Sequence, residues 1–386
     1  MDIQSIDKQF VAGTYARFPL TLVKGNGSLV YDENGKEYID LGTGIAVNAF
    51  GVGDSEWKKA VIAQLDCIQH TSNLYYSAPC ATLAKTLCER TGMKKVFFSN
   101  SGAEANECAI KTARKYGADT KGKDYYTIIT LKNSFHGRTI TTLSATGQDV
   151  FHEHFTPMTE GFVHATANDI EELKTLVQTH KCCGIMIELV QGEGGVTALS
   201  KDYVQEVAAL AKQEGLLLMV DEVQTGNGRT GALYAYMQYG IMPDVVTTAK
   251  GLGGGLPIGA TMLGEKVENL FTPGLNGSTF GGNPVACAGA LSILQRIDDS
   301  LLAGVVERSK YIFQTLTGAK GVKSVSGMGL MIGIECEDAS AVIARCMERG
   351  VLVIKAKNKV RLLPALNIPM DILKKAINIL KEELEK

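Results

Sequence analysis

The chain has 386 residues, and its 39 Lys and Arg residues nearly balance its 41 Asp and Glu residues, for a formal net charge of −2. This balance argues against nucleic acid as the main partner, because phosphate backbones attract strongly basic surfaces. Hydrophobic residues make up 45% of the chain, as in a packed globular protein and unlike a disordered one. No apolar run approaches the roughly 20 residues that cross a bilayer. We therefore expect no membrane span, and the N-terminal residues show no secretion signal.

The N-terminal residues contain a predicted hairpin, with a strand at 29–31 and a turn at 33–35. From about residue 94, short apolar runs alternate with helical stretches. The runs span 96–98, 125–130, 184–188, 216–220, 245–248 and 260–263, and the helices span 103–116 and 201–214. This alternation predicts an α/β fold in which strands buried on both faces form a mostly parallel central sheet flanked by helices.

The pattern of apolar runs and helical stretches in the C-terminal part predicts a smaller α+β unit. Its strands are expected at 322–325, 330–335, 351–354 and 360–363, and its helices at 339–349 and 370–384. The N-terminal hairpin has no core of its own, so we expect it to pack on this unit. The chain is thus divided into an N-terminal segment 1–45, a large domain 46–285 and a small domain 286–386.

The nine cysteines are an odd number without the paired spacing of metal ligands. We therefore expect free thiols in a reducing cytoplasm rather than a disulfide framework. Cys182-Cys183 and the triplet 152–154 lack complementary ligands at usable spacing, so no metal site is expected.

Polar residues follow several predicted strands, and in sheets of this kind ligands bind beyond the carboxyl ends of the strands. Ser99–Glu104 follows the strand 96–98, where a helix begins. Small polar residues and Gly102 leave backbone N–H groups free at this point, which suits a phosphate. Ordinary N-capping of the helix would explain the same residues without a ligand.

Two further strands end in chemically active side chains. Asp221, Glu222 and Gln224 follow one of them. A carboxylate at the rim of a dry core needs a partner, either a structural donor or a cationic group of a ligand. Lys250 follows the strand 245–248 and precedes a glycine-rich stretch. Burial would lower its pKa and make its amine a nucleophile or Schiff-base former, unless the side chain extends to solvent.

Two segments resemble nucleotide motifs but fail on inspection. Gly117–Lys123 matches most of a P-loop, but Asp124 replaces the required Ser or Thr, and the segment follows a helix instead of a strand. The glycines after Lys250 lack the third glycine of GxGxxG, where Leu256 stands. A nucleotide site is therefore not expected.

A phosphate seat, an acid and a lysine at one sheet edge together indicate pyridoxal 5'-phosphate (PLP). Lys250 would carry the cofactor as a Schiff base, and Asp221 would keep its pyridine nitrogen protonated. The helix start at Gly102 would seat the phosphate. The protonated ring then serves as an electron sink.

Seven segments in order then carry a family resemblance: Leu41–Asn48, Asn100–Asn106, Ser134–Thr139, Gln191–Gly195, Asp221–Gly226, Thr248–Gly255 and Ser278–Pro284. In these segments, and over nearly its whole length, the chain resembles the class III aminotransferases of fold type I, and within them the acetylornithine aminotransferases. The resemblance implies the PLP-transferase fold and a homodimer with composite active sites. One departure is Gly51–Glu56, which lacks the two His residues and the Pro that the family usually has there.

The resemblance also implies residue roles. Lys250 and Asp221 would be the catalytic residues. The cofactor would be held by Ser101, Gly102, Ala103, Phe135, Asp221, Glu222, Val223, Gln224, Lys250 and Thr279. The substrates would be held by Tyr15, Arg138, Glu193, Ser278 and Arg361. Ser278 and Thr279 would reach across from the neighbouring subunit, Thr279 to the phosphate.

For the reaction, the resemblance implies transamination between N2-acetyl-L-ornithine and 2-oxoglutarate, giving N-acetyl-L-glutamate 5-semialdehyde and L-glutamate, in arginine biosynthesis. Related enzymes that act on ornithine, succinylornithine, N-succinyldiaminopimelate or 4-aminobutyrate share the catalytic residues and remain alternatives. So do a PLP aminomutase and a non-catalytic binding protein.

Overall fold

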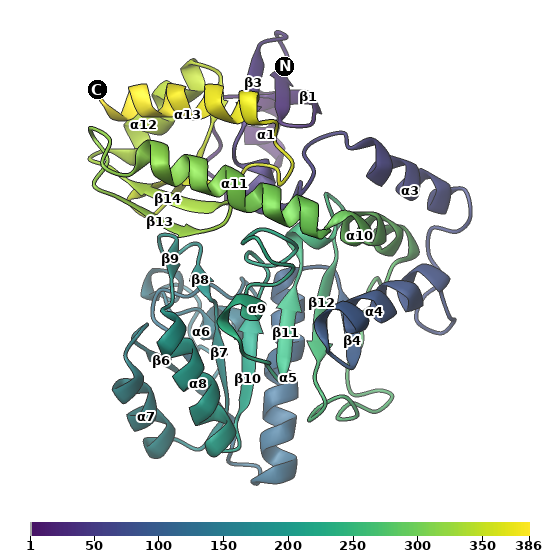
Figure 1. The fold of residues 1–386 in the computed structure, drawn as a ribbon. Helices are drawn as coiled ribbons and strands as arrows, with labels where there is room; N and C mark the ends of the chain where they lie inside the picture. The colour runs from purple at the N-terminus through teal and green to yellow at the C-terminus, as the bar shows by residue number, and fades with distance from the viewer. Residues whose placement is uncertain (1) are drawn as a thin grey trace.

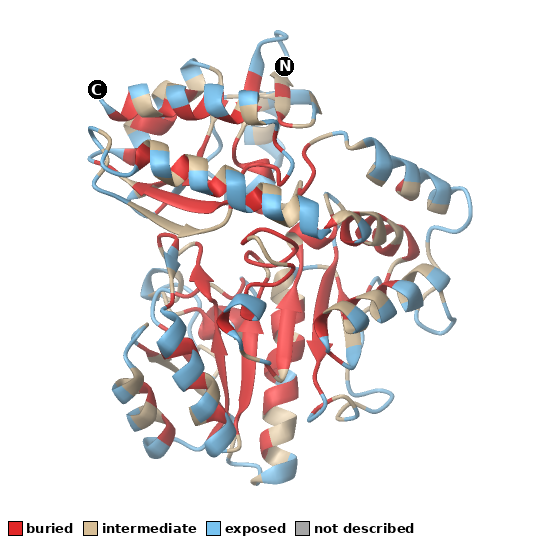
Figure 2. Ribbon diagram, in the orientation of Figure 1, coloured by how far each residue is buried: buried red, intermediate tan, exposed pale blue. Residues whose placement is uncertain are grey.

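The computed structural model describes residues 2–386. Its centre is a seven-stranded sheet with the strand order β4-β12-β11-β10-β7-β5-β6 (Figure 1). The strands are β4 (Lys95–Ser99), β5 (Thr127–Leu131), β6 (Phe162–Ala165), β7 (Cys182–Ile187), β10 (Leu217–Asp221), β11 (Val245–Thr248) and β12 (Gly259–Leu263). Five of them, β5, β7, β10, β11 and β12, are buried along their whole length (Figure 2), as a sheet covered on both faces requires.

The sheet is mostly parallel, as predicted, but β12 runs antiparallel to both of its neighbours. The other strands therefore end at one edge of the sheet, while β12 begins there, with Gly259 paired to Ser99 and Ala260 paired to Thr248. The chain that leaves β11 at Lys250 thus returns to the same edge at Gly259.

Helices cover the sheet on both sides. The long helix α5 (Gly102–Thr120) crosses one face, and α7 (Ile170–Thr179) and α8 (Lys201–Gln213) lie on the other (Figure 1). The remaining helices of this region are α2 (Thr43–Ala46), α3 (Ser55–Leu65), α4 (Ala78–Thr91), α6 (Ile140–Ala145), α9 (Tyr236–Tyr239) and α10 (Pro284–Arg296), with short 3-10 turns at Asp149–Phe151 and Lys250–Leu252. The two-residue strands β8 (Val190–Gln191) and β9 (Thr197–Ala198) form a small separate hairpin.

The C-terminal part forms a four-stranded antiparallel sheet of order β13-β14-β17-β16. Its elements are α11 (Asp299–Leu316), β13 (Ser324–Met328), β14 (Met331–Glu335), α12 (Ala339–Glu348), β16 (Ile354–Ala356), β17 (Lys359–Leu362) and α13 (Met370–Leu384). The N-terminal elements are α1 (Ile3–Phe10), β1 (Leu22–Asn26), β2 (Leu29–Asp32) and β3 (Glu37–Asp40). In Figure 1 the two ends of the chain lie together above the central sheet.

The predicted strand 351–354 is divided between two sheets. Its first half, β15 (Val351–Leu352), pairs in parallel with β3, whereas its second half joins β17 as β16. This pairing confirms that the N-terminal hairpin packs on the C-terminal unit. The single-strand prediction was wrong because the chain changes partner at the buried Val353, and a run of apolar residues does not reveal which strand it pairs with. The domain boundaries at 45/46 and 285/286 stay predictions.

Gly51–Glu56, which lacks the His and Pro residues usual in the family, still leads into a helix. Gly51 and Gly53 have φ values of +81° and +71°, and the carbonyl of Gly27 would lie 2.4 Å from a Cβ at Gly51. Asp54 then caps α3 by accepting a hydrogen bond of 2.8 Å from the backbone N–H of Trp57. The glycines thus provide a tight turn, and an aspartate provides the helix start.

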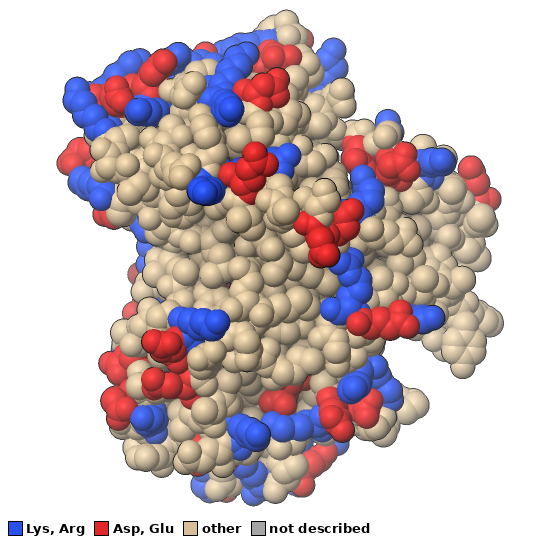
Figure 3. Space-filling model, viewed as in Figure 1, with Lys and Arg blue, Asp and Glu red and all other residues tan. Residues whose placement is uncertain are grey.

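On the face shown in Figure 3, acidic and basic side chains are interspersed, without a large patch of one sign. Within residues 2–386, no helix is both long and apolar enough to cross a bilayer. No group of three or more His, Cys, Asp and Glu residues in the same range is arranged to hold a metal ion.

Helix α5 extends four residues beyond the predicted end because Gly117 lies inside it. A Cβ at Gly117 would meet the Tyr125 carbonyl oxygen at 2.2 Å and Cys183 Cβ at 2.5 Å. We expect Gly117→Ala to cost about 1–3 kcal/mol through overpacking, although alanine favours helices. Thermal unfolding followed by circular dichroism would show a lower midpoint. Gly13→Ala, where no atom lies within 4 Å of the new Cβ, is the matched control. A midpoint equal to that of the control would contradict the prediction.

Candidate active site

A cavity of about 400 Å³ opens at the edge of the sheet where the parallel strands end. It brings together many of the residues predicted from the sequence: Ser101, Gly102, Ala103, Phe135, Arg138, Asp221, Val223, Gln224 and Lys250. Residues far apart in the chain meet here because parallel strands deliver their carboxyl ends to one edge.

Lys250 lies directly beyond β11 and starts a 3-10 turn with a φ of +47°. A positive φ is uncommon for a residue with a side chain, and such strain concentrates at functional sites. Burial is the main cause that lowers the Lys250 pKa to about 8, and the charge of Arg361 lowers it further. The carboxylates of Glu193, Asp221 and Glu188 oppose this effect. The amine therefore loses its proton more readily than an ordinary lysine, although it is mostly protonated at pH 7.

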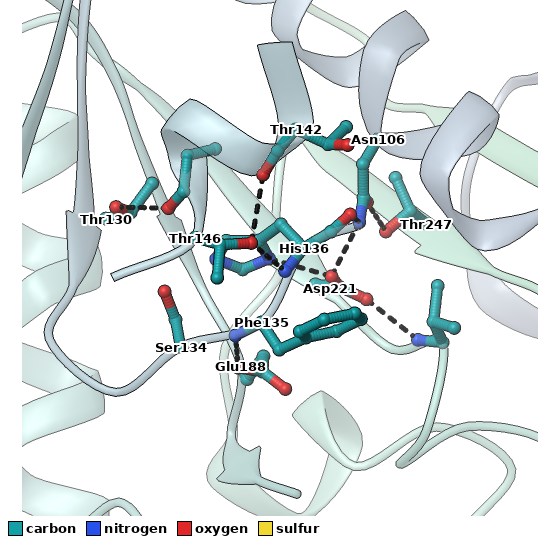
Figure 4. Close-up of polar contacts among 12 residues, drawn as sticks. Asn106, Thr130, Ser134, Phe135, His136, Thr142, Thr146, Glu188, Asp221 and Thr247 are labelled. Carbon is teal, nitrogen blue, oxygen red and sulfur yellow. Dashed lines mark hydrogen bonds and ion pairs between the residues drawn. The ribbon is translucent and has the colours of Figure 1, made fainter. Parts of the chain in front are cut away.

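Asp221 ends β10 as a buried carboxylate with a full set of donors (Figure 4). Its Oδ2 accepts hydrogen bonds from Asn106 Nδ2 at 2.7 Å and from His136 Nδ1 at 2.8 Å, and its Oδ1 accepts one from Val223 N at 3.0 Å. Asn106 Nδ2 also donates to the His136 carbonyl, and Asn106 Oδ1 accepts from Thr247. These donors satisfy the buried carboxylate and fix its orientation.

Sequence reasoning gave no role to Asn106 or His136, although both lie in segments that carry the family resemblance. His136 Nε2 is buried and has no hydrogen-bond partner among the described residues. An unpaired buried nitrogen is costly, so this atom is a place where a bound group or a water would satisfy it. The position of His136, directly after the predicted cofactor-stacking residue Phe135, could have indicated that it belongs to the site.

Glu188 is a second buried carboxyl group of the cavity that was missed. It directly follows β7, and its Oε2 accepts a hydrogen bond of 2.8 Å from the backbone N–H of Phe135. Burial, followed by the charge of Asp221, raises the pKa of Glu188 well above its usual range. The sequence did indicate this residue, since Glu188 ends the apolar run 184–188 much as Asp221 follows the apolar run 216–220.

The cavity wall carries an arginine over aromatic rings. The guanidinium carbon of Arg138 lies 4.1 Å from the centre of the Phe151 ring and 5.3 Å from that of Phe135. The two rings meet edge to face at 6.1 Å. This stacking holds the long side chain of Arg138 in place while its N–H groups stay exposed to a ligand.

A second arginine is covered by an acid. Arg361, buried on β17, donates through Nη1 to Glu193 Oε1 at 2.7 Å and to Gln224 Oε1 at 3.3 Å. Gln224 Nε2 also donates to Glu193 Oε1 at 3.3 Å. Burial alone would raise the Glu193 pKa, but the charge of Arg361 and its hydrogen bond outweigh burial and lower it. The C-terminal unit thus contributes a masked cation to the site.

The start of α5 forms a seat for an anion. Ser101 caps the helix by accepting from Glu104 N at 3.2 Å. A Cβ at Gly102 would lie 2.7 Å from the Val223 side chain, so only glycine lets the helix end approach the loop after β10. Free N–H groups at the start of a 19-residue helix, a buried acid and a lysine together fit the phosphate, ring nitrogen and aldehyde of PLP.

Several predicted residues lie elsewhere. The Glu222 carboxylate accepts from Thr225 Oγ1 and from the backbone N–H groups of Ala235 and Tyr236, so it holds a loop and does not line the cavity. The side chain of Tyr15 is exposed on the N-terminal segment, outside the cavity. Thr279 lines a separate cavity of about 280 Å³. The hydroxyl of Ser278, the residue before Thr279, accepts from Asn100 Nδ2 at 3.2 Å.

Comparison with known proteins identifies the family. Residues 10–384 match the family model described as Aminotransferase class-III. The chain belongs to the class III aminotransferases. It is 48% identical to the acetylornithine aminotransferase of Haemophilus ducreyi, over 99% of this chain and 98% of that protein. It is 43% identical to the acetylornithine aminotransferase of Caldanaerobacter subterraneus subsp. tengcongensis, over 98% of each chain.

Solved structures agree with the class III assignment. The ornithine aminotransferase of Toxoplasma gondii superposes with a TM-score of 0.95 at 29% identity, over 99% of this chain and 94% of that one. The N-acetylornithine aminotransferase of Stenotrophomonas maltophilia superposes with a TM-score of 0.85 at 33% identity, over 98% and 97%. The fold type I architecture is confirmed, and the cofactor of this class III aminotransferase is PLP.

The half-buried Lys250 gives the cofactor-free protein a pH-dependent stability. The folded-state pKa of about 8 lies below the model value of 10.5, so the unfolded chain binds more protons. The resulting destabilisation is complete below pH 8 and is lost as pH rises toward 10.5. We expect Lys250→Met to stabilise the cofactor-free protein by about 2–3 kcal/mol at pH 7, from the 1.36 kcal/mol per pKa unit.

Thermal unfolding of the cofactor-free protein at pH 7 and pH 10 measures this effect. The gain at pH 7 should shrink by most of its size at pH 10. The exposed Lys59→Met is the control, and it should change the midpoint little at either pH. A gain for Lys250→Met that is the same at both pH values would contradict the prediction.

Proposed function

We propose that this class III aminotransferase transfers the ω-amino group of N2-acetyl-L-ornithine to 2-oxoglutarate, giving N-acetyl-L-glutamate 5-semialdehyde and L-glutamate, in arginine biosynthesis. The names of its relatives support this substrate, since proteins 39–48% identical over at least 96% of the chain are called acetylornithine aminotransferases. The observation that carries the proposal is Arg361 masked by Glu193, close enough to Lys250 for both charges to act on its pKa, with Arg138 on the wall of the cavity that contains Lys250.

PLP, when bound, supplies a positively charged ring that withdraws electrons as the substrate loses a proton at the carbon bearing the amine. Lys250 would hold the cofactor aldehyde through its amine. When released and neutral, that amine would take the proton from the substrate carbon and later give it back. Its pKa of about 8 suits this work, since a base near the working pH both accepts and releases protons.

The other residues hold and polarise the cofactor. Asp221, fixed by Asn106 and His136, would hold the ring nitrogen protonated. The helix start at Ser101–Ala103 would hold the phosphate, and Phe135 and Val223 on the cavity wall would pack against the ring. Gln224 would donate to the phenolic oxygen once its bond to Glu193 is released. Glu222 acts through the loop that it holds.

The two arginines solve a problem of substrate shape. Acetylornithine carries its reacting amine far from its carboxylate, whereas glutamate carries both on one carbon. Arg138 pairs with the distant carboxylate of either substrate, since a guanidinium binds a carboxylate through two parallel hydrogen bonds. Glu193 covers Arg361 for acetylornithine and releases it for the α-carboxylate of glutamate. Tyr15 would close over the substrate from the N-terminal segment, and Ser278 would approach the substrate from a second subunit.

We also propose a homodimer with shared sites. Thr279 lies outside the cavity that contains Lys250 in its own chain, which supports a role in a second copy. The side chains of Leu74, Tyr75, Tyr76 and Phe280 are exposed near it, and a group of large exposed apolar side chains typically marks an interface. The nine cysteines are all free, which supports a reducing compartment such as the cytoplasm.

Ornithine remains a second candidate substrate, because solved ornithine aminotransferases superpose with TM-scores up to 0.95. Initial rates at equal concentration with 2-oxoglutarate test the proposal against ornithine, succinylornithine, N-succinyldiaminopimelate and 4-aminobutyrate. We expect acetylornithine to have the highest kcat/KM, by about tenfold or more over ornithine, because the acetyl group removes the charge of the α-amine and with it the cost of desolvating that charge. A preference for any other amine would reassign the substrate, and no activity with any of them would favour a mutase or a binding protein.

The arginine switch predicts unequal losses in the two half-reactions. Arg361→Ala should slow the glutamate half-reaction by about 100-fold or more, because a charged hydrogen-bond pair is lost, and the acetylornithine half-reaction by less than about tenfold. Stopped-flow absorbance under single-turnover conditions measures each half separately. Arg138→Ala is the matched control and should slow both. Equal losses for Arg361→Ala in the two halves would refute the switch.

A further inference from the structure

One side chain fixes the loop that carries Thr279. Asn73 donates through Nδ2 to the Ser278 carbonyl at 3.0 Å and to the Gly281 carbonyl at 2.9 Å. These two carbonyls flank Thr279 and Phe280 in the chain, so the amide closes the base of a short loop and leaves its tip free. Since both acceptors are carbonyl oxygens, the orientation of the amide is fixed, with its nitrogen toward the loop.

Further contacts hold the same loop to its own chain. Gly281 N donates to Ser278 Oγ at 3.0 Å, and Asn283 Nδ2 donates to the Gln69 carbonyl at 2.9 Å. A Cβ at Gly281 would lie 2.1 Å from the Phe98 carbonyl oxygen, so the base of the loop lies directly on β4. The loop is therefore anchored on one side by β4 and on the other by the segment 69–73.

The base of the loop touches the rim of the cavity of the same chain, where Asn100 donates to Ser278 Oγ at 3.2 Å, but Thr279 lies outside that cavity. Thr279 lines a cavity with His70, Tyr75 and Tyr76, whereas Lys250 and the start of α5 line another. Phe280 at the tip is exposed, and its ring lies 5.4 Å from that of His70. The loop thus projects from an apolar, exposed region with a hydroxyl at its tip and no ligand group of its own chain beside it.

We propose that Asn73 is a positioning residue for the active site of the neighbouring subunit: it fixes the loop 278–281 that presents Thr279 to the PLP phosphate across the interface. This inference rests on the proposed homodimer and adds to it the residue on which the crossing loop depends. The amide of Asn73 is exposed in a single chain, and its hydrogen bonds strengthen when a second subunit excludes water.

The expected effect follows from how often the loop adopts the binding conformation. If loss of the amide leaves the loop in that conformation about a tenth of the time, PLP binds about tenfold more weakly. The residues that contact PLP in the same chain are unchanged. The loss should therefore appear in PLP affinity without a matching change in folding.

The first experiment measures PLP affinity by equilibrium dialysis for wild type, Asn73→Asp and Thr71→Ala. Aspartate has the shape of asparagine but cannot donate to the two carbonyls. Thr71 lies in the same segment, and its hydroxyl donates to the neighbouring Ser72 carbonyl. We expect about tenfold weaker binding for Asn73→Asp and wild-type binding for Thr71→Ala, with equal dimer mass by light scattering and equal thermal midpoints without cofactor. Wild-type PLP affinity of Asn73→Asp would overturn the proposal.

The second experiment tests the crossing itself. Two variants, Asn73→Asp and Lys250→Ala, are co-expressed with different tags, and the doubly tagged mixed dimer is isolated. Its only site with Lys250 belongs to the Asn73→Asp subunit and receives Thr279 from the subunit with an intact Asn73. We expect this site to retain PLP with wild-type affinity, at one PLP per dimer. Affinity as weak as in the Asn73→Asp homodimer would mean that Asn73 acts on its own site, and would refute the inference.

Other results would refute the proposed function itself, and they can be told apart from failure of the Asn73 inference. A wild-type protein that retains no PLP would refute the proposed chemistry. A wild-type protein that is monomeric would refute the dimer and with it the role of Asn73. A mixed dimer of wild type and Lys250→Ala, which should retain one PLP at normal affinity, calibrates the measurement.

Discussion

The site depends on how buried charges are balanced at one edge of the sheet. Asp221 raises the pKa of Glu188, Arg361 lowers that of Glu193, and Arg361 opposes three carboxyl groups in setting that of Lys250. In such surroundings an unpaired charge is expensive, so each group is either paired, neutralised or held by several donors. Three N–H groups point at Asp221, the charge of Arg361 and its hydrogen bond lower the pKa of Glu193 against the effect of burial, and burial lowers the pKa of Lys250.

The same balance connects the two parts of the fold. Arg361 is on a strand of the C-terminal sheet, yet its partners Glu193 and Gln224 belong to loops at the edge of the central sheet. Close after Arg361 in the chain, Leu366 N donates to the Ala49 carbonyl at 2.8 Å, and the Pro364 carbonyl accepts a hydrogen bond from Arg229 Nη1. The position of the second arginine is therefore set by the packing of the terminal unit on the central one, and a change in that packing would reach the site through this side chain.

Much of this arrangement could be predicted from the sequence, since short apolar runs locate buried strands and polar residues at their ends locate the site. The limits of β11 and α13 agree with prediction residue for residue, and the residues from Ser101 to Lys250 that were expected to converge largely do. Other features depend on pairing in three dimensions. The direction of β12, the division of 351–354 between two sheets and the turning away of Glu222 leave no periodic signal in the chain. The donors to Asp221 were missed for the same reason, because Asn106 is an ordinary helix residue until the strand beside it is known.

Because β12 runs antiparallel to its neighbours, the length of the connection that precedes it is constrained. The segment 251–258 leaves the sheet edge after the reactive lysine and returns to that edge to begin a strand buried on both faces. One residue inserted within β12 itself would slip its register and exchange the faces of every side chain beyond it. One residue inserted in the segment 251–258 would have to bulge into the cavity whose wall Gly255–Ile258 forms. The number of residues between Lys250 and β12 is therefore tightly constrained. Insertions or grafted loops should be placed at other connections of the fold.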